Sequence, residues 1–345
     1  MKQIDTRDAV GHVLCHDITR IIPGVEKGPV FKKGHIVTEE DIPVLLSVGK
    51  EHLYVWEKTE GMLHENEAAD ILRDICMGDT TLIRSTPPSE GKVELIANVD
   101  GLLKIRRDAL MAVNSLGEMM IATTHGDFPV RKGDKLAGTR IIPLVIEEEK
   151  LQRAREAAGE EPILSIVPFK HVRYGLVITG NEVYSGLIED KFGPVIKSKM
   201  AEYDTDFMGQ VILPDDKEGI ISAIKNFASE GADIILCSGG MSVDPDDKTP
   251  GAIKDAGADV ISYGAPVLPG AMFLLSYLKT DEEKEIPVMG LPGCVMYARR
   301  TIFDLVLPRV LAGERLTAED LAIYGEGGLC LSCPECHFPN CGFGK

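Results

Sequence analysis

Residues 232–240 have the sequence ADIILCSGG, an apolar run followed by a serine and two glycines. A short apolar run bounded by glycine is typical of a strand that is buried on both faces of a sheet. The two glycines let a ligand approach the backbone closely. We therefore interpret residues 232–237 as a strand, and Ser238, Gly239 and Gly240 as the turn at its carboxyl end.

Strands and helices alternate with this run in both directions along the chain. Apolar runs typical of strands occupy residues 174–178, 207–213 and 286–291. Strand–helix alternation is typical of a parallel sheet covered by helices. We predict that residues 165–315 form a three-layer α/β domain with a mostly parallel sheet, whose ligand lies beyond the carboxyl ends of the strands. The predicted helices lie near 194–203 and over 217–230, 250–256 and 293–310.

The remaining chain divides into three parts. Residues 1–146 combine short β-like runs with a helical pattern over 65–77, which predicts a smaller, β-rich α+β domain. Residues 147–164 are charged, rich in helix formers, and followed by glycine and proline, so we predict a linker helix. Residues 316–345 contain four of the eight cysteines and form a predicted Cys-rich, metal-binding tail.

The composition disfavours several classes of protein. The chain has 345 residues, 44% hydrophobic and 26% charged, which is typical of globular proteins with more than one domain. Its net charge of −17 disfavours nucleic-acid binding, which depends on cations that neutralise phosphates. No apolar run approaches the roughly 18 residues that span a membrane, and residues 1–8 lack the apolar core of a secretion signal. We expect a cytoplasmic protein that binds neither nucleic acid nor membranes.

Three acidic residues follow strands of the predicted sheet. Glu182, Asp215 and Asp247 each come soon after a strand ends. Because the carboxyl ends of parallel strands meet at one edge of a sheet, these side chains are predicted to converge there. Three carboxylates beside free helix amides suit Mg²⁺ that holds a phosphate or pyrophosphate.

Each of these features also has a purely structural interpretation. Glu182 taken alone is more often a solvated loop carboxylate, and Asp215 can cap the helix that begins near residue 217. The Ser-Gly-Gly segment can be a tight turn before a helix that Thr249 caps, with Pro250 at its first position. The interpretation as a site depends on the features occurring together.

Six segments in a fixed order carry a resemblance to a known family. They are TGNE at 179–182, PDD at 214–216, SGGMSV at 238–243, Asp247, PG at 269–270 and GLPG at 290–293. The ordered set resembles the molybdopterin-binding domain that the MoeA and MogA/MoaB families of molybdenum cofactor synthesis share. The resemblance covers about residues 170–312. The spacing around the last two segments, and the pattern of residues 30–56, look more like MoeA.

The resemblance implies a function and a set of site residues. Proteins of this kind bind the phosphate and dithiolene end of molybdopterin, usually as homo-oligomers. MoeA inserts molybdate into adenylated molybdopterin with Mg²⁺ and releases AMP. The family's acidic catalytic positions correspond to Glu182, Asp215 and Asp247. Its ligand-binding positions correspond to Thr179, Gly180, Ser238, Gly239, Gly240, Ser242, Pro269, Gly270, Pro292 and Gly293.

The chain departs from MoeA at positions that matter for catalysis. The Asp-Gly-Tyr-Ala motif of MoeA does not occur, and Leu268 and Ala271 replace the lysines that flank its Pro-Gly loop. An oxyanion such as molybdate favours cations there, and Arg299 and Arg300 are the nearest candidates in sequence. Two alternatives to molybdate insertion stay open. One is a non-catalytic protein that carries or senses molybdopterin, or matures a molybdoenzyme. The other is a molybdopterin adenylyltransferase.

The tail contains the most local metal-binding pattern in the chain. Cys330, Cys333, Cys336 and Cys341 have the spacing C-x2-C-x2-C-x4-C. Successive gaps of three resemble the spacing that binds iron–sulfur clusters in bacterial ferredoxins, although the last gap is one residue longer. Zinc also takes four thiolates, and unliganded thiols are the remaining interpretation. We expect a [4Fe–4S] cluster or Zn²⁺, on a tail that can be removed after Gly328 without unfolding the sheet domain.

Overall fold

The computed structural model describes residues 2–22, 26–55, 60–242, 244, 247–281 and 283–345. Contacts between residues divide the chain into two compact units. The chain enters the second unit twice before residue 166, a division that the sequence pattern did not indicate. The first unit comprises Met1–Ala97, Ile105–Thr124 and Lys135–Ser165, and the second comprises Asn98–Lys104, His125–Asp134 and Ile166–Lys345.

The first unit is a β-rich α+β arrangement, as the sequence predicts. Its largest sheet has four antiparallel strands in the order β6-β7-β11-β9, and three two-stranded sheets pair β1 with β4, β2 with β3, and β5 with β12. Its elements are β1 Lys2–Asp5, η1 Thr6–Asp8, β2 Ile18–Ile22, β3 Glu26–Phe31, α1 Asp41–Ser47, β4 His52–Val55, β5 Met62–His64, α2 Glu65–Cys76, β6 Ile83–Ser85, β7 Lys92–Ala97, α3 Arg107–Asn114, β9 Met119–Thr123, β11 Lys135–Ile141, β12 Val145–Glu147 and α4 Glu148–Ala158.

The charged stretch after residue 146 forms helix α4, and this helix packs against α2 and α3. Leu151, Ala154 and Ala158 are buried at spacings of three and four, the spacing that places side chains on one face of a helix. Two of these three residues are alanines, which add little to the hydrophobic periodicity of the sequence. Their small side chains let α4 approach α2 and α3 closely. The predicted linker helix is therefore a packed part of the first unit.

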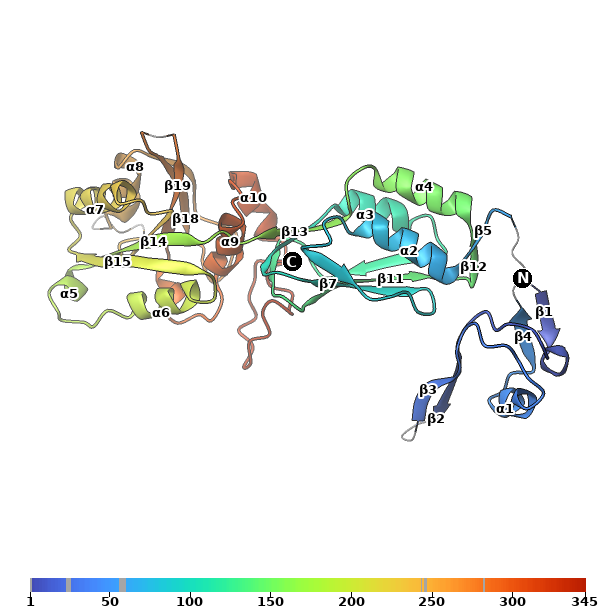
Figure 1. Cartoon of the computed structure of the whole chain (residues 1–345). Coiled ribbons are helices and arrows are strands. Elements are labelled where there is room, and N and C mark those ends of the chain that lie inside the picture. Colours follow the sequence, from blue (N-terminus) through green and yellow to red (C-terminus); the bar gives the residue numbers. More distant parts are fainter. Residues whose placement is uncertain (1, 23–25, 56–59, 243, 245–246, 282) are drawn as a thin grey trace. The chain divides into compact units, whose positions relative to one another are not determined.

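The second unit is built on a six-stranded sheet in the order β15-β14-β16-β19-β18-β17. The first four strands are parallel, and β18 and β17 are antiparallel to their neighbours. Figure 1 shows this sheet with its helices. The elements are β8 Gly101–Ile105, β10 Phe128–Val130, β13 Leu164–Pro168, β14 Val172–Thr179, α5 Asn181–Tyr184, α6 Phe192–Met200, β15 Thr205–Leu213, α7 Lys217–Ser229, β16 Ile234–Ser238, α8 Thr249–Asp255, β17 Ala258–Tyr263, β18 Leu274–Lys279, β19 Glu285–Leu291, η2 Gly293–Met296, α9 Ile302–Leu311, α10 Ala318–Ala322 and η3 Ile323–Gly325.

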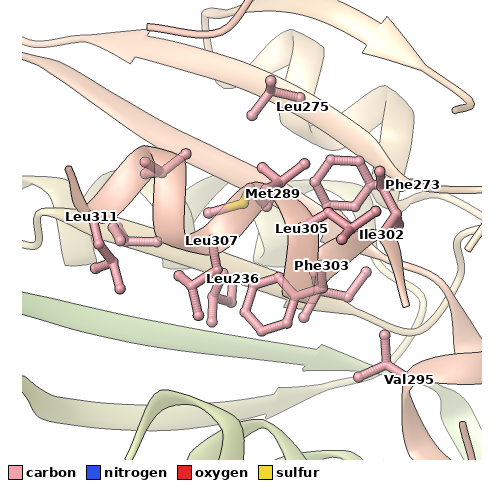
Figure 2. Close-up of a cluster of buried hydrophobic side chains, with 14 of the residues drawn as sticks. Leu236, Phe273, Leu275, Met289, Val295, Ile302, Phe303, Leu305, Leu307 and Leu311 are labelled. Atoms are coloured by element: carbon pink, nitrogen blue, oxygen red, sulfur yellow. The ribbon is translucent and has the colours of Figure 1, made fainter. Parts of the chain in front are cut away.

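Two hydrophobic cores, one on each face of the sheet, make the second unit a three-layer structure. Successive strand side chains point to opposite faces, so Leu176 and Leu236 join one core, whereas Val177 and Ile235 join the other. The first core is completed by α6 and α9, and the second by α7 and α8. Figure 2 shows the first core, where Phe303 and Leu307 of α9 meet Leu236. The predicted three-layer α/β fold is confirmed.

Two local predictions are wrong in the second unit, and two of its strands were missed. Strands β17 and β18 were not predicted, because a short run such as LLSYLK fits a buried helix or a strand equally well. The helix predicted from residue 293 is a 3₁₀ turn, and α9 begins only at Ile302, where Thr301 and Asp304 form a capping box. Thr249 is the first residue of α8 and makes no cap.

The cysteine-rich tail packs on the second unit. Phe343 is 4% exposed and belongs to the first core, and Cys330, Phe338 and Cys341 pack against that core. A backbone hydrogen bond also connects the end of the tail to its earlier part, since Gly344 N donates to Gly327 O at 2.9 Å. The tail is therefore a packed part of this unit, and removing it after Gly328 would expose part of the core. Whether the sheet domain keeps its fold after that truncation stays a prediction.

A single substitution tests this packing. Phe343→Ala is expected to lower the free energy of unfolding by about 3 kcal/mol, because a buried ring is removed and a cavity remains. Leu331→Ala in the same tail is the matched control, since Leu331 is 80% exposed, and its effect is expected to stay within about 0.5 kcal/mol. Urea unfolding followed by circular dichroism measures both. Equal stabilities of the two variants would contradict the packed tail.

Candidate functional site

The predicted site segments meet at one edge of the second unit's sheet. Thr179 at the end of β14 pairs with Leu213 of β15, and Ser238 at the end of β16 pairs with Leu291 of β19. Ile178 is the partner of Ser238 on the other side. Because these strands are parallel, the turns that follow all four strands emerge at the same edge. The predicted convergence of the turns is therefore observed.

The Ser-Gly-Gly turn fits closely against the end of β14. Gly239 has φ +94°, and a Cβ built there would collide with the Thr179 carbonyl oxygen. At Gly240, with φ +53°, a Cβ would lie 3.0 Å from Thr249 Oγ1 and 3.3 Å from Thr179 Oγ1. Only glycine combines these backbone angles with such a close approach. The turn is thus held by packing as well as by its own conformation.

Two buried threonines connect this turn to helix α8. Thr179 is 3% exposed and Thr249 is fully buried, and their hydroxyl oxygens lie 3.1 Å apart in a hydrogen bond. The bond explains why Thr249 does not cap α8. Ser238 is also fully buried, and its hydroxyl has no hydrogen-bond partner among the described residues. Leaving such a group unpaired costs about 1–3 kcal/mol, an expense that is typical of functional sites.

Asp215 is positioned by the neighbouring loop. Its Oδ2 accepts a hydrogen bond from Asn181 N at 3.2 Å, and Asp215 N donates to Asn181 Oδ1 at 3.3 Å. The capping interpretation of Asp215 is wrong, because Asp216 is the N-cap of α7 and accepts from Gly219 N at 2.9 Å. The Asp215 carboxylate instead lies beside the glycine turn, 3.5 Å from where a Cβ on Gly240 would be.

Asp247 closes the loop after the glycine turn. Its Oδ2 accepts from Ser242 N at 2.6 Å, and Tyr263 Oη donates to the Met241 carbonyl at 2.9 Å. Burial, and then the charge of Asp247, raise the pKa of Tyr263. Tyr263 was missed by sequence reasoning, because it ends a strand that was itself not predicted. Val243, part of the matched sequence segment, lies outside the described residues.

Glu182 is the third acidic residue predicted for the site. It is exposed on the short helix α5, near Gly180. Across the described ranges, no three His, Cys, Asp or Glu side chains are grouped so that they could hold a metal ion. The Mg²⁺ site formed by Glu182, Asp215 and Asp247 therefore stays a prediction.

A cavity of about 620 Å³ opens where the turns meet. This volume lies within the range of roughly 300–1,000 Å³ that is typical of small-molecule sites. Its wall includes predicted ligand-binding positions from three turns, namely Gly239, Gly240, Ser242, Pro269, Gly270, Pro292 and Gly293. Thr179, Gly180 and Ser238 are absent from the described lining. Thr179 and Ser238 are buried and support the turn from behind the cavity wall.

The cavity wall carries little charge. Asp247 is the single charged side chain among the described residues that line it. Leu268 and Ala271, which stand where MoeA has lysines, also line it. Apolar groups supply much of the remaining wall, including Met241 and Tyr297. A flat apolar ring system with a few polar groups suits such a wall better than a free oxyanion does.

The four tail cysteines line a second cavity in the same unit, of about 650 Å³. Its wall also contains Arg299, Arg300 and His337. Among the cysteines outside the tail, burial raises the pKa of the Cys76 and Cys237 thiols to about 12. Those two thiols are therefore protonated and unreactive at neutral pH.

Comparison with known families agrees with this geometry. Residues 175–312 match the family described as a probable molybdopterin binding domain. Residues 3–57 match a domain of unknown function, DUF8806. The molybdopterin-binding match covers the sheet, the glycine turns and the 620 Å³ cavity. It supports molybdopterin binding by this part of the chain.

Curated relatives match over a short segment. CinA-like proteins from Mycobacterium sp. (strain MCS) and Mycobacterium tuberculosis (strain H37Rv) are 35% identical over 77 residues, which is 22% of this chain. A CinA-like protein from Mycolicibacterium vanbaalenii is 36% identical over 78 residues. The matched segment spans 18% of the length of these relatives.

Two solved structures that resemble part of this chain are a MoaB and a CinA protein. The tungsten cofactor synthesizing protein MoaB from Pyrococcus furiosus has a TM-score of 0.32 and 22% identity, covering 36% of this chain and 84% of that chain. CinA from Thermoplasma acidophilum has a TM-score of 0.30 and 18% identity, covering 36% of this chain and 89% of that chain. With TM-scores below 0.5, neither structure carries a conclusion about activity.

None of the helices in the described ranges has both the length and the apolar character of a transmembrane span.

The close contact at Gly239 gives a test of the site's construction. Gly239→Ala is expected to lower the free energy of unfolding by at least about 1 kcal/mol, because the new Cβ meets the Thr179 backbone at a positive φ. Gly293→Ala is the matched control from the same cavity wall, since a Cβ there meets nothing within 4 Å. Its effect is expected within about 0.5 kcal/mol. Similar urea unfolding midpoints for both variants would contradict the close packing of the turn.

Proposed function

We propose that the second unit binds molybdopterin, or its adenylate, in the 620 Å³ cavity, and that the protein acts in molybdenum cofactor biosynthesis. The observation that carries the proposal is the gathering of Gly239, Gly240, Pro269, Gly270 and Pro292–Gly293 on one cavity wall. These segments are far apart in sequence, and each one is part of the ordered set that resembles the molybdopterin-binding domain of MoeA and MogA/MoaB. The match of residues 175–312 to the molybdopterin-binding family supports the same ligand.

The proposed reaction is insertion of molybdate into adenylated molybdopterin with release of AMP. Asp215 and Asp247 flank the glycine turn and would hold Mg²⁺ against the pyrophosphate, and Glu182 would join them from α5. When bound, Mg²⁺ would neutralise charge on the phosphoryl oxygens as the bond to AMP breaks. The Asn181–Asp215 hydrogen bonds hold one carboxylate in place, and the Asp247–Ser242 bond holds the loop that carries the other.

A second candidate is a non-catalytic molybdopterin carrier or sensor. The observation that favours it is the wall chemistry, since Leu268 and Ala271 take the place of lysines and the described lining contains no cation. Without a cation, molybdate has little electrostatic attraction to the cavity. A carrier needs only the pterin contacts. An adenylyltransferase is a further possibility, which requires turnover of ATP in the absence of molybdate.

One assay separates these candidates. Purified full-length protein is incubated with adenylated molybdopterin, molybdate and Mg²⁺, and the release of AMP is followed. The insertion proposal predicts AMP release that requires both molybdate and Mg²⁺. Binding of the adenylate without AMP release would favour the carrier. Consumption of ATP with molybdopterin alone would favour the adenylyltransferase. Failure to bind either pterin would overturn the proposed function.

Adjacent aspartates provide a matched pair of variants for the reaction. Asp215→Asn is expected to lower the rate of AMP release about tenfold or more, because a carboxylate that would hold the metal loses its charge. Asp216→Asn is the control, since asparagine caps a helix as well as aspartate does. Its rate and its stability are expected to match those of the unaltered protein. Equal rates for the two variants would remove Asp215 from the reaction.

A further inference from the structure

The tail is a loop that is anchored to the second unit at both ends. At its start, Leu268 N donates to Gly328 O at 2.9 Å, and Cys330 N donates to Leu268 O at 2.8 Å. At its end, the buried Phe343 fixes the chain in the core. Cys330 belongs to the first anchor, and the other three tail cysteines lie between the two anchors. Closing a loop costs conformational entropy, and here packing and backbone hydrogen bonds already meet that cost.

The opposite wall of the second cavity is held rigidly. Lys199 Nζ donates to the Arg299 carbonyl at 2.8 Å and to Asp304 Oδ1 at 2.7 Å, and the Lys199 and Asp304 side chains are 9% and 3% exposed. Arg299 Nη1 in turn donates to the Pro334 carbonyl at 3.0 Å. The Arg300 guanidinium lies 5.0 Å from the centre of the Phe338 ring. The middle of the tail is therefore held over residues 297–300.

Charge in this cavity favours an anionic centre. Four thiolates around a divalent ion, or around a cluster, carry a net negative charge. Arg299 and Arg300 line the cavity, whereas Asp and Glu are absent from its described lining. Arg300 is paired with Glu202 and Asp304, whereas Arg299 has no acidic partner among the described residues, so we expect Arg299 to supply more of the positive charge. Positive groups beside a thiolate centre stabilise it.

We propose that Cys330, Cys333, Cys336 and Cys341 bind one thiophilic metal centre in the second cavity. No three of them are in a metal-binding arrangement among the described residues. Binding therefore requires Cys333 and Cys336, which are exposed, to turn toward the half-buried Cys330 and Cys341. The spacing of the first three cysteines favours a [4Fe–4S] cluster, and Zn²⁺ shares the same ligand chemistry.

The metal centre adjoins the cavity proposed for molybdopterin. Pro269 and Tyr297 line both cavities. The backbone hydrogen bonds of Leu268 to residues 328 and 330 connect the tail directly to this shared wall. Closing the tail around a metal therefore stiffens one side of the pterin cavity. This consequence rests on the proposed function, whereas the metal centre itself does not.

Metal content tests the centre without reference to the pterin. Full-length protein is purified anaerobically without chelators, and iron, sulfide and zinc are quantified per chain together with the visible spectrum. The expected result is one centre per chain: four iron and four sulfide with broad visible absorption, or one zinc without it. The absence of both metals, in this preparation and after reconstitution with iron and sulfide or with zinc, would overturn the proposal.

Cysteine variants tie the metal to these four ligands. Cys333→Ser and Cys336→Ser change exposed residues, so the fold is expected to survive, and metal content should fall about tenfold or more. Cys294→Ser, a half-buried cysteine outside the tail, is the control and should retain the metal. Unchanged metal content in both tail variants would place the metal elsewhere and overturn the assignment.

A second arm tests the connection between the cavities. Molybdopterin affinity is measured for the metal-loaded protein and for Cys333→Ser. A change of about threefold or more supports the shared wall, since stiffening a binding site alters the entropy of ordering it. Equal affinities would overturn the connection but leave the metal centre in place. Loss of pterin binding in both proteins would instead count against the proposed function.

Discussion

The close approach of Gly239 to the Thr179 backbone is the contact on which the site depends. It brings the turn after β16 against the end of β14, and the Thr179–Thr249 hydroxyl pair then fixes the start of α8. The loop between them is closed by the Asp247–Ser242 hydrogen bond. A side chain larger than hydrogen at 239 separates these parts. The missing side chains of Gly239 and Gly240 and the two buried hydroxyls therefore hold the turn against β14 and α8.

Much of this arrangement follows from the sequence, because it rests on local patterns. Buried parallel strands are continuous apolar runs, and residues 174–178 and 232–237 show this pattern clearly. The docking of the tail does not follow, since Phe338 and Phe343, set among glycines, prolines and cysteines, form no periodic pattern. Strand β18 is ambiguous for a related reason, as its apolar run fits a helix or a strand.

The acidic residues show where sequence reasoning stops. Asp215 and Asp216 are neighbours of the same chemical type, and only the geometry of the first turn of α7 assigns the cap to Asp216. That assignment leaves Asp215 beside the glycine turn. The sequence shows that Leu268 and Ala271 stand where MoeA has lysines. Only the structure places both positions on the cavity wall. Binding of the pterin fits this weakly charged wall. Insertion of molybdate makes the stronger demand, because an oxyanion favours cations that the described lining lacks.

Molybdopterin is proposed to bind where the strand-end turns meet. A crystal structure of the full-length protein with molybdopterin bound tests it most directly. The expected result is a pterin in the 620 Å³ cavity, with its phosphate near Gly239–Ser242 and its rings between Pro269–Met272 and Pro292–Tyr297. A pterin bound elsewhere on the chain, with this cavity still open, would contradict it.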